Sequence, residues 1–118
     1  MQKILLVDDD ADTRMILQEV LEYSEFQVLS AIDGEESITK VQNENPDIVL
    51  MDIAMPKMNG LEAIEKIRQF SKVPVLIITA FQKVQYVDQL KKLNVQGFFQ
   101  KPLNPVELID RITALLQK

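Results

Sequence analysis

The chain has 118 residues with a formal net charge of −5, and its 47% hydrophobic and 26% charged residues are the balance of one ordinary globular domain. It contains no cysteine and no histidine, which excludes disulfides, thiol nucleophiles, histidine bases and histidine-ligated zinc. The acidic balance argues against a nucleic-acid surface, and the apolar runs are far shorter than the ~18 residues of a membrane span. With no room for a signal peptide before the first apolar run, we expect a cytoplasmic protein whose chemistry uses Asp, Glu, Lys, Thr, Ser or a bound ion.

Five short apolar runs alternate along the chain with segments whose apolar residues recur at helical spacing. The predicted strands are Ile4–Val7, Val28–Leu29, Ile48–Met51, Val75–Ile78 and Gly97–Gln100. The runs are continuous rather than alternating, which is typical of strands buried on both faces of a parallel sheet.

Helices are predicted between and after these strands. Their apolar stripes are Ile16, Leu17, Val20, Leu21 and Tyr23 in the first, Leu61, Ile64 and Ile67 in the third, and Leu108, Ile109, Ile112, Leu115 and Leu116 in the last. Asp33 and Asn104 are predicted caps, each three residues before a Glu, and Pro105 stands at a first helical position. The weakest helix prediction covers residues 82–93, because its stripe includes two β-branched valines.

The resulting order, a strand followed by a helix five times over, predicts a single domain over residues 1–118. We expect an α/β, doubly wound (βα)5 flavodoxin-like fold, with a parallel five-stranded sheet of order 2-1-3-4-5 and helices on both faces. Such a fold places its ligand crevice beyond the carboxyl ends of strands 1 and 3.

Polar and charged side chains stand at the strand ends that border this crevice. They are Asp8, Asp9 and Asp10 after the first strand, Asp52 after the third, Thr79 after the fourth and Lys101 after the fifth. If Asp8, Asp9 and Asp52 converge, each like-charged pair ~4 Å apart costs roughly 4 kcal/mol at an effective dielectric of about 20, so the site needs shifted pKa values or a cation. Carboxylate oxygens with open positions suit Mg²⁺.

A carboxylate nucleophile, a hard cation, a lysine and a hydroxyl make a phosphoryl-transfer site. We expect Asp52 to be the nucleophile, because it is single, central and at the end of the most buried strand. Asp8 and Asp9 are then metal ligands, whereas Asp10 is expected only to cap the first helix.

The same residues carry a resemblance to a known family. The chain resembles the receiver domain of two-component response regulators over essentially all of its 118 residues. The matching motifs are Leu6-Val7-Asp8-Asp9, Asp33-Gly34-Glu35-Glu36, Pro46-Asp47 followed by Ile48 to Asp52, Met55-Pro56-Lys57-Met58-Asn59-Gly60, Ile78-Thr79-Ala80 and Gly97-Phe98-Phe99-Gln100-Lys101-Pro102. Each motif alone is weak, but all of them in order at the family's spacing are specific.

The resemblance implies a phosphoacceptor and a metal site. Asp52 would accept a phosphoryl group from a histidine of a sensor histidine kinase or a histidine phosphotransfer protein, which fits a chain without histidine. Mg²⁺, or Mn²⁺ in its place, would be held by Asp9 and Asp52 with the backbone carbonyl of Ala54, and by Asp8 through metal-bound water. Beyond this self-phosphorylation and self-dephosphorylation, no enzyme activity is expected.

The resemblance also implies a switch. Thr79 would hydrogen-bond the phosphoryl group, Lys101 would pair with it, and the Lys101–Pro102 peptide bond is usually cis in the family. Phe98 matches the aromatic residue that swings inward with Thr79, and strand parity predicts that it lies on the opposite face from Lys101 and Phe99. The segment 82–93 would be the element that the phosphoryl charge biases.

Two positions that tune the phosphoryl lifetime in the family are Ala54 and Phe81 here. Neither side chain can polarise an attacking water, and Phe81 is expected to crowd the entrance, so slow self-dephosphorylation is our hypothesis. The first helix would meet the phosphoryl donor, and the last two helices with the last strand would meet a downstream protein target. We expect a monomer or a phosphorylation-dependent dimer, without direct DNA or membrane binding.

Three other functions compete with a stand-alone regulator of the chemotaxis or sporulation-phosphorelay kind. A haloacid-dehalogenase type phosphohydrolase would use an Asp-x-Asp within residues 8–12, but it would leave Asp52 idle. A flavin-binding module needs a phosphate loop after the first strand, where three aspartates would repel phosphate. The chain could also be the receiver of a DNA-binding regulator. Its end at Lys118, just after the last helix, favours signalling through protein contact.

Overall fold

The computed structural model describes residues 1–55 and 58–117, without the side chains at 83 and 84. Pro56 and Lys57, part of one predicted motif, lie outside the described residues. The strands are β1 (Lys3–Val7), β2 (Gln27–Ala31), β3 (Ile48–Met51), β4 (Val75–Thr79) and β5 (Gly97–Gln100). The helices are α1 (Ala11–Tyr23), α2 (Gly34–Glu44), α3 (Gly60–Ile67), α4 (Val87–Leu93) and α5 (Pro105–Leu116), with a 3₁₀ turn, η1 (Lys83–Tyr86), before α4.

The five strands form one sheet of order β2-β1-β3-β4-β5, and all neighbouring pairs are parallel. The predicted topology is therefore confirmed. Every residue of β3 and β4 is buried, as their continuous apolar runs indicated. Burial on both faces places the ends of these two strands in the middle of the molecule, and the end of β3 lies next to the end of β1.

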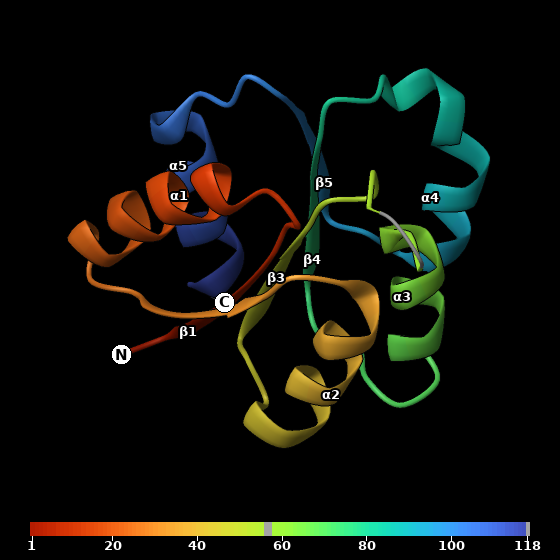
Figure 1. The fold of residues 1–118 in the computed structure, drawn as a ribbon, viewed down its shortest axis with the longest axis horizontal. Helices are drawn as coiled ribbons and strands as arrows, with labels where there is room; N and C mark the ends of the chain where they lie inside the picture. Colours follow the sequence, from red (N-terminus) through yellow and green to blue (C-terminus); the bar gives the residue numbers. More distant parts are fainter. Residues whose placement is uncertain (56–57, 118) are drawn as a thin grey trace.

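Two helical layers cover the sheet, with α1 and α5 on one face and α2, α3 and α4 on the other (Figure 1). Alternate residues of β1 serve the two layers, since Leu5 and Val7 belong to the α2–α3–α4 cluster and Ile4 and Leu6 to the α1–α5 cluster. No helix in the described ranges is long and apolar enough to cross a membrane.

Helix starts follow the predicted caps with one exception. The Asp33 carboxylate accepts from the Glu36 N–H at 2.8 Å, and the Asn104 side chain accepts from two N–H groups at the start of α5, with Pro105 as its first residue. Asp10 is the residue that precedes α1, but its side chain makes no capping bond. It accepts a hydrogen bond from the Thr13 hydroxyl at 2.6 Å instead, so the predicted cap is wrong in its geometry.

Two helix predictions differ from the structure. In α1 only Leu17 and Leu21 are buried, whereas Ile16 is 59% and Tyr23 92% exposed, because a helix on one face of a sheet buries a narrower arc than the predicted stripe. The segment predicted as one helix over 82–93 divides into η1 and α4. The division lies at Tyr86, whose φ of −127° and ψ of 9° are not helical.

Candidate functional site

Three carboxylates meet at the carboxyl edge of the sheet. Asp8 and Asp9 follow β1, Asp52 follows β3, and one oxygen from each lies within 4.8 Å of the others. Asp8 and Asp52 are buried, at 0% and 4% exposure, while Asp9 is exposed. The strand-end rule thus brings together side chains 44 residues apart, with Asp9 open to solvent.

Lys101 joins two of these carboxylates from the end of β5. Its Nζ lies 2.7 Å from Asp8 Oδ2 and 3.1 Å from Asp52 Oδ2. Its backbone N–H donates to the carbonyl of Thr79 at 2.7 Å, which fixes the residue beside β4. The Lys101–Pro102 peptide bond is cis, as expected from the family resemblance.

Backbone hydrogen bonds orient the buried carboxylates. The Asp10 N–H donates to Asp8 Oδ1 at 3.0 Å, and the Ala54 N–H donates to Asp52 Oδ1 at 2.8 Å. Each carboxylate therefore offers one oxygen to the backbone and the other to Lys101. This leaves both groups in fixed orientations before any ligand binds.

Sequence reasoning missed the contacts by which two residues, Arg14 and Gly60, support the site. The Arg14 guanidinium, from the first turns of α1, donates to the Asp8 carbonyl at 2.7 Å. Gly60, the first residue of α3, packs against the backbone of Asp52 and Ile53, where an added Cβ would lie 2.7 Å from Ile53 Cα. The signal for Arg14 was available, since it is a cation six residues after Asp8 in a helix that leads away from the site.

The charges of the site are incompletely balanced. Burial, and to a smaller extent the charge of Asp52, keep the pKa of Asp8 above its usual value, although hydrogen bonds from Lys101 and Asp10 act against this. Burial alone would lower the pKa of Lys101, but the two carboxylates outweigh it and raise that pKa. Three carboxylates against one ammonium leave two negative charges uncompensated within this group, which suits a divalent cation with oxygen ligands.

Thr79 is fully buried at the end of β4, and its hydroxyl accepts a long hydrogen bond of 3.4 Å from the Phe81 N–H. The Phe81 ring is 40% exposed and stacks on Tyr86, with ring centroids 5.8 Å apart and an interplanar angle of 22°. This aromatic pair, which the sequence did not indicate, connects the Thr79 loop with the residue before α4.

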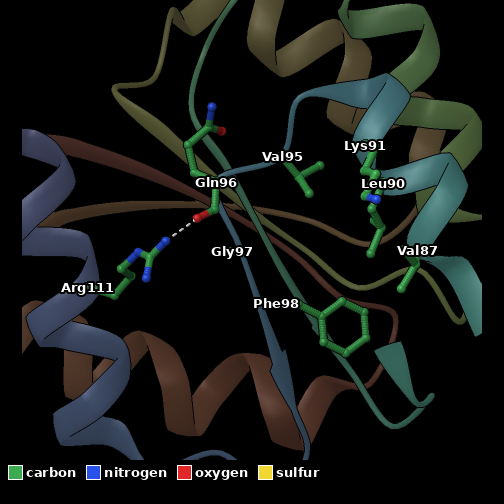
Figure 2. Close-up of a pocket in the computed structure, with 8 residues that line it drawn as sticks. All are labelled: Val87, Leu90, Lys91, Val95, Gln96, Gly97, Phe98 and Arg111. Atoms are coloured by element: carbon green, nitrogen blue, oxygen red, sulfur yellow. Dashed lines mark hydrogen bonds between the residues drawn. The ribbon is translucent and has the colours of Figure 1, made fainter. Parts of the chain in front are cut away.

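Phe98 lies on the face of the sheet predicted by strand parity. It is half-buried against the α2–α3–α4 cluster, whereas Phe99 packs with the α1–α5 cluster. A groove of about 520 Å³ runs beside it between α4, β5 and α5, lined by Val87, Leu90, Lys91, Val95, Gln96, Gly97, Phe98 and Arg111 (Figure 2). The groove borders the amino-terminal half of β5, away from the carboxylates at the strand ends.

The response regulator receiver domain model matches residues 4–113 of the chain. The chain belongs to this family. It is 40% identical over 120 residues to the transcriptional regulatory protein CpxR homolog of Haemophilus influenzae, covering 100% of this chain and 52% of that protein. Among solved structures, chemotaxis protein CheY4 of Vibrio cholerae superimposes with a TM-score of 0.91 at 29% identity, covering 98% of this chain and 99% of CheY4. A CheY-like receiver domain protein from Methanospirillum hungatei gives a TM-score of 0.94 at 26% identity, covering 98% and 94%.

Membership makes this chain a receiver domain of two-component signalling, a class that interacts with histidine kinases or phosphotransfer proteins. The receiver spans about half the length of the curated relatives it matches.

Proposed function

We propose that this receiver domain accepts a phosphoryl group on Asp52 from a phosphohistidine of a sensor kinase or phosphotransfer protein, and that the phosphoryl group changes the surface formed by α4, β5 and α5. The observation that carries the proposal is the position of Lys101 Nζ, 2.7 Å from Asp8 and 3.1 Å from Asp52, in a cluster of three carboxylates. We propose further that residues 1–118 form this one domain.

Asp52 is the nucleophile in this proposal. Its carboxylate attacks the phosphorus of the phosphohistidine, an acyl phosphate O–P bond forms, and the P–N bond breaks so that the imidazole remains on the partner. The Ala54 N–H at 2.8 Å and Lys101 hold the two carboxylate oxygens, which fixes the direction of attack. The ammonium also compensates negative charge that builds up on the transferred group.

The carboxylates fit a magnesium site. Asp8, Asp9 and Asp52 provide hard oxygen ligands within 4.8 Å, and the Ala54 carbonyl follows Asp52 by two residues. Mg²⁺ bound there would neutralise charge between the phosphoryl oxygens and these acids. Because Asp9 is exposed, the ion would have access from solvent and would keep open positions for water.

Thr79 and Phe98 are the proposed switch residues. The Thr79 hydroxyl is buried at the end of β4, and within the described residues its one hydrogen bond is the long one of 3.4 Å from the Phe81 N–H, which it would lose on turning toward a phosphoryl group. A space left by such a turn can admit the Phe98 ring, which is half-buried on the α4 side of the sheet. The phosphoryl group adds a charge of roughly −2, so the change at Asp52 is electrostatic. Its consequence is a different side-chain packing at the surface formed by α4, β5 and α5.

The phosphoryl group on Asp52 is hydrolysed slowly in this proposal. Ala54 and Phe81 offer no group that could act as a base toward water at the phosphoryl group. The Phe81 ring stacks on Tyr86, so it narrows the approach from the Thr79 loop as part of a pair rather than alone.

The receiver can act as a stand-alone regulator or as one part of a longer one. The chemotaxis protein CheY4, which is matched over 99% of its own length, is the precedent for the stand-alone role that we propose. The CpxR homolog, of which the chain covers 52%, favours a DNA-binding regulator as the second candidate. An immunoblot of source cells with an antibody raised against residues 1–118 distinguishes them, because the first predicts a band near 13.5 kDa and the second a band about twice that size, from the half-length match.

Intact mass after incubation with Mg²⁺ and acetyl phosphate tests the phosphoacceptor. One added phosphoryl group is expected for the natural sequence, and none is expected for Asp52→Ala or with a chelator present. Asp12→Ala, an exposed acid at the start of α1, is the matched control and should still be phosphorylated. An adduct that persists in Asp52→Ala would refute the assignment, and steady release of phosphate without an adduct would favour a phosphohydrolase.

A further inference from the structure

The two ends of α4 are held in very different ways. At its amino end, the helix follows the 3₁₀ turn η1, and the residue before it, Tyr86, makes no side-chain capping bond. At its carboxyl end, the carbonyls of Leu93 and Asn94 accept hydrogen bonds from the side chain of Arg68. The carboxyl end of this seven-residue helix is thus tied to a neighbouring element by hydrogen bonds, whereas Tyr86 at its amino end is held by packing against the α2–α3–α4 cluster. Packing contacts can shift without unfolding the helix, so the amino end is the end that can change its position.

Arg68, the residue that ends α3, connects three segments through one guanidinium group. Its Nε donates to Leu93 O at 2.8 Å and its Nη2 to Asn94 O at 3.2 Å. Its Nη1 donates to Val73 O at 2.7 Å and to Ser71 O at 3.3 Å. The rigid fork of the guanidinium therefore ties the end of α4 to the end of α3 and to the loop before β4.

The acceptors of Arg68 are all backbone carbonyls, and no carboxylate in the described part of the chain forms an ion pair with it. The last carbonyls of a helix lack donors within the helix, and its carboxyl end carries partial negative charge, so a cation satisfies both. Burial lowers the pKa of Arg68 from its usual value, as expected for a guanidinium that has left water. The hydrogen bonds of Arg68 thus hold the carboxyl end of α4 in place, and Arg68 is not a solvated surface charge.

The amino end of α4 is connected to the phosphoacceptor site by two weak links. Thr79 accepts from the Phe81 N–H at 3.4 Å, and the Phe81 ring stacks on Tyr86 at 5.8 Å between centroids. Rotation of the Thr79 hydroxyl toward a phosphoryl group would lengthen a bond that is already long. The stack would then carry the displacement of Phe81 to the start of the helix.

We propose that α4 turns about its carboxyl end when Asp52 is phosphorylated, with Arg68 as the fixed point and the Phe81–Tyr86 pair as the moving end. This rests on the proposed function of Asp52 and Thr79. The turn would move Val87, at one end of the groove in Figure 2, relative to Phe98, while Val95 at the other end keeps its place. Partner binding would therefore depend on the width of the groove at its Val87 end.

Hydrogen exchange measured by mass spectrometry, with and without Mg²⁺ and acetyl phosphate, reports on the two ends of α4 separately. In the natural sequence, phosphorylation should change exchange in residues 81–88 and leave residues 91–96 unchanged. In Arg68→Met, exchange of residues 91–96 should rise on the order of tenfold before phosphorylation, because helix-end carbonyls lose donors. Lys92→Met removes an exposed cation from the same helix end, and exchange there should stay within about threefold.

A tyrosine signal provides a second measurement. The chain has two tyrosines and no tryptophan, and Tyr23 is 92% exposed, so Tyr23→Phe leaves Tyr86 as the single reporter beside the Phe81 ring. Its fluorescence should change on phosphorylation in this background. If Arg68→Met does not fold, Arg68→Lys keeps the charge without the fork and should show the same rise in exchange.

The outcomes separate failure of the hinge from failure of the proposed function. Equal changes in residues 81–88 and 91–96 on phosphorylation would overturn the hinge, since the helix would then move as a whole. Unaltered exchange of residues 91–96 in both Arg68 variants would overturn it too. If no phosphoryl mass appears on the protein, the proposed function fails, while the comparison of unphosphorylated Arg68 and Lys92 variants still decides whether Arg68 anchors the helix end.

Discussion

Replacing Asp8 by asparagine is expected to stabilise the metal-free protein at neutral pH. Asp8 is fully buried and shares its surroundings with Asp9 and Asp52, with oxygens within 4.8 Å. Burial is the main reason that its pKa is raised, so the ionised form is held in the folded state at a cost. Asparagine keeps the shape of the side chain and an acceptor for the Asp10 N–H, but it carries no charge.

The magnitude follows from three opposing effects on the Asp8 carboxylate. Attraction to Lys101 at 2.7 Å favours it by about 6 kcal/mol, whereas each of the two neighbouring carboxylates, with an oxygen within 4.8 Å, disfavours it by at least about 3.5 kcal/mol, all at an effective dielectric of about 20. Desolvation of a buried carboxylate costs several kcal/mol more. We therefore expect Asp8→Asn to raise the free energy of unfolding by at least about 1 kcal/mol, which corresponds to roughly 4 °C in Tm for a domain of this size.

The pH dependence of this stability difference is a second test of whether the charge of Asp8 destabilises the fold. The pKa of Asp8 in the folded protein lies above the ordinary value of 3.8. As the pH falls through that folded pKa, Asp8 takes up a proton, and the folded state no longer bears the cost of its buried charge. The difference in free energy of unfolding between Asp8→Asn and the natural protein should thus be largest at neutral pH and absent below pH 3.8.

Urea unfolding followed by circular dichroism, in chelator and across this pH range, measures the difference. Asp10→Asn is the control. The hydrogen bond from the Thr13 hydroxyl lowers the pKa of the exposed Asp10, so removal of the Asp10 charge should slightly destabilise the protein at neutral pH. Added Mg²⁺ should stabilise the natural sequence more than Asp8→Asn. An asparagine variant that is less stable than the natural protein in chelator, or whose advantage persists in acid, would refute the reasoning.

Two further substitutions test the lifetime of the phosphoryl group and the start of α5. Phe81→Glu should speed loss of the added phosphoryl mass at least about tenfold, because a carboxylate near the site can polarise water; an unchanged decay would show that Phe81 does not limit hydrolysis. Asn104→Ala should lower the free energy of unfolding by about 1 kcal/mol in urea, because the Val106 and Glu107 N–H groups lose their acceptor. Unchanged stability there would mean that water replaces the cap without loss.

The sheet could be predicted from the sequence because its central strands are buried on both faces. The bounds of β3 agree with the apolar run Ile48–Met51, and those of β5 with the predicted 97–100. The edge strand β2 extends over Gln27–Ala31, although only Val28 and Leu29 were predicted. An edge strand is partly exposed, so polar residues such as Gln27 and Ser30 are tolerated in it and shorten the apolar signal.

The central groups of the site could also be predicted, because parallel strands deliver the residues after them to one edge. This rule places Asp8, Asp52 and Lys101 in contact without any knowledge of side-chain conformation. For the Arg14 bond to the Asp8 carbonyl, the sequence offered only a cation a few residues after Asp8, and for the stack of Phe81 on Tyr86 it offered no signal. They depend on how a helix and a loop pack, which periodicity does not report.

The ion pair between Lys101 and Asp8 joins residues 93 positions apart, and this has a consequence during synthesis. A growing chain that has reached β4 already contains every carboxylate of the site, but it lacks the ammonium that pairs with them and the last strand of the sheet. The three carboxylates and Lys101 thus come together only after residue 101 has left the ribosome. If the proposed function holds, copies that end before residue 101 should not be phosphorylated, because they lack this ammonium.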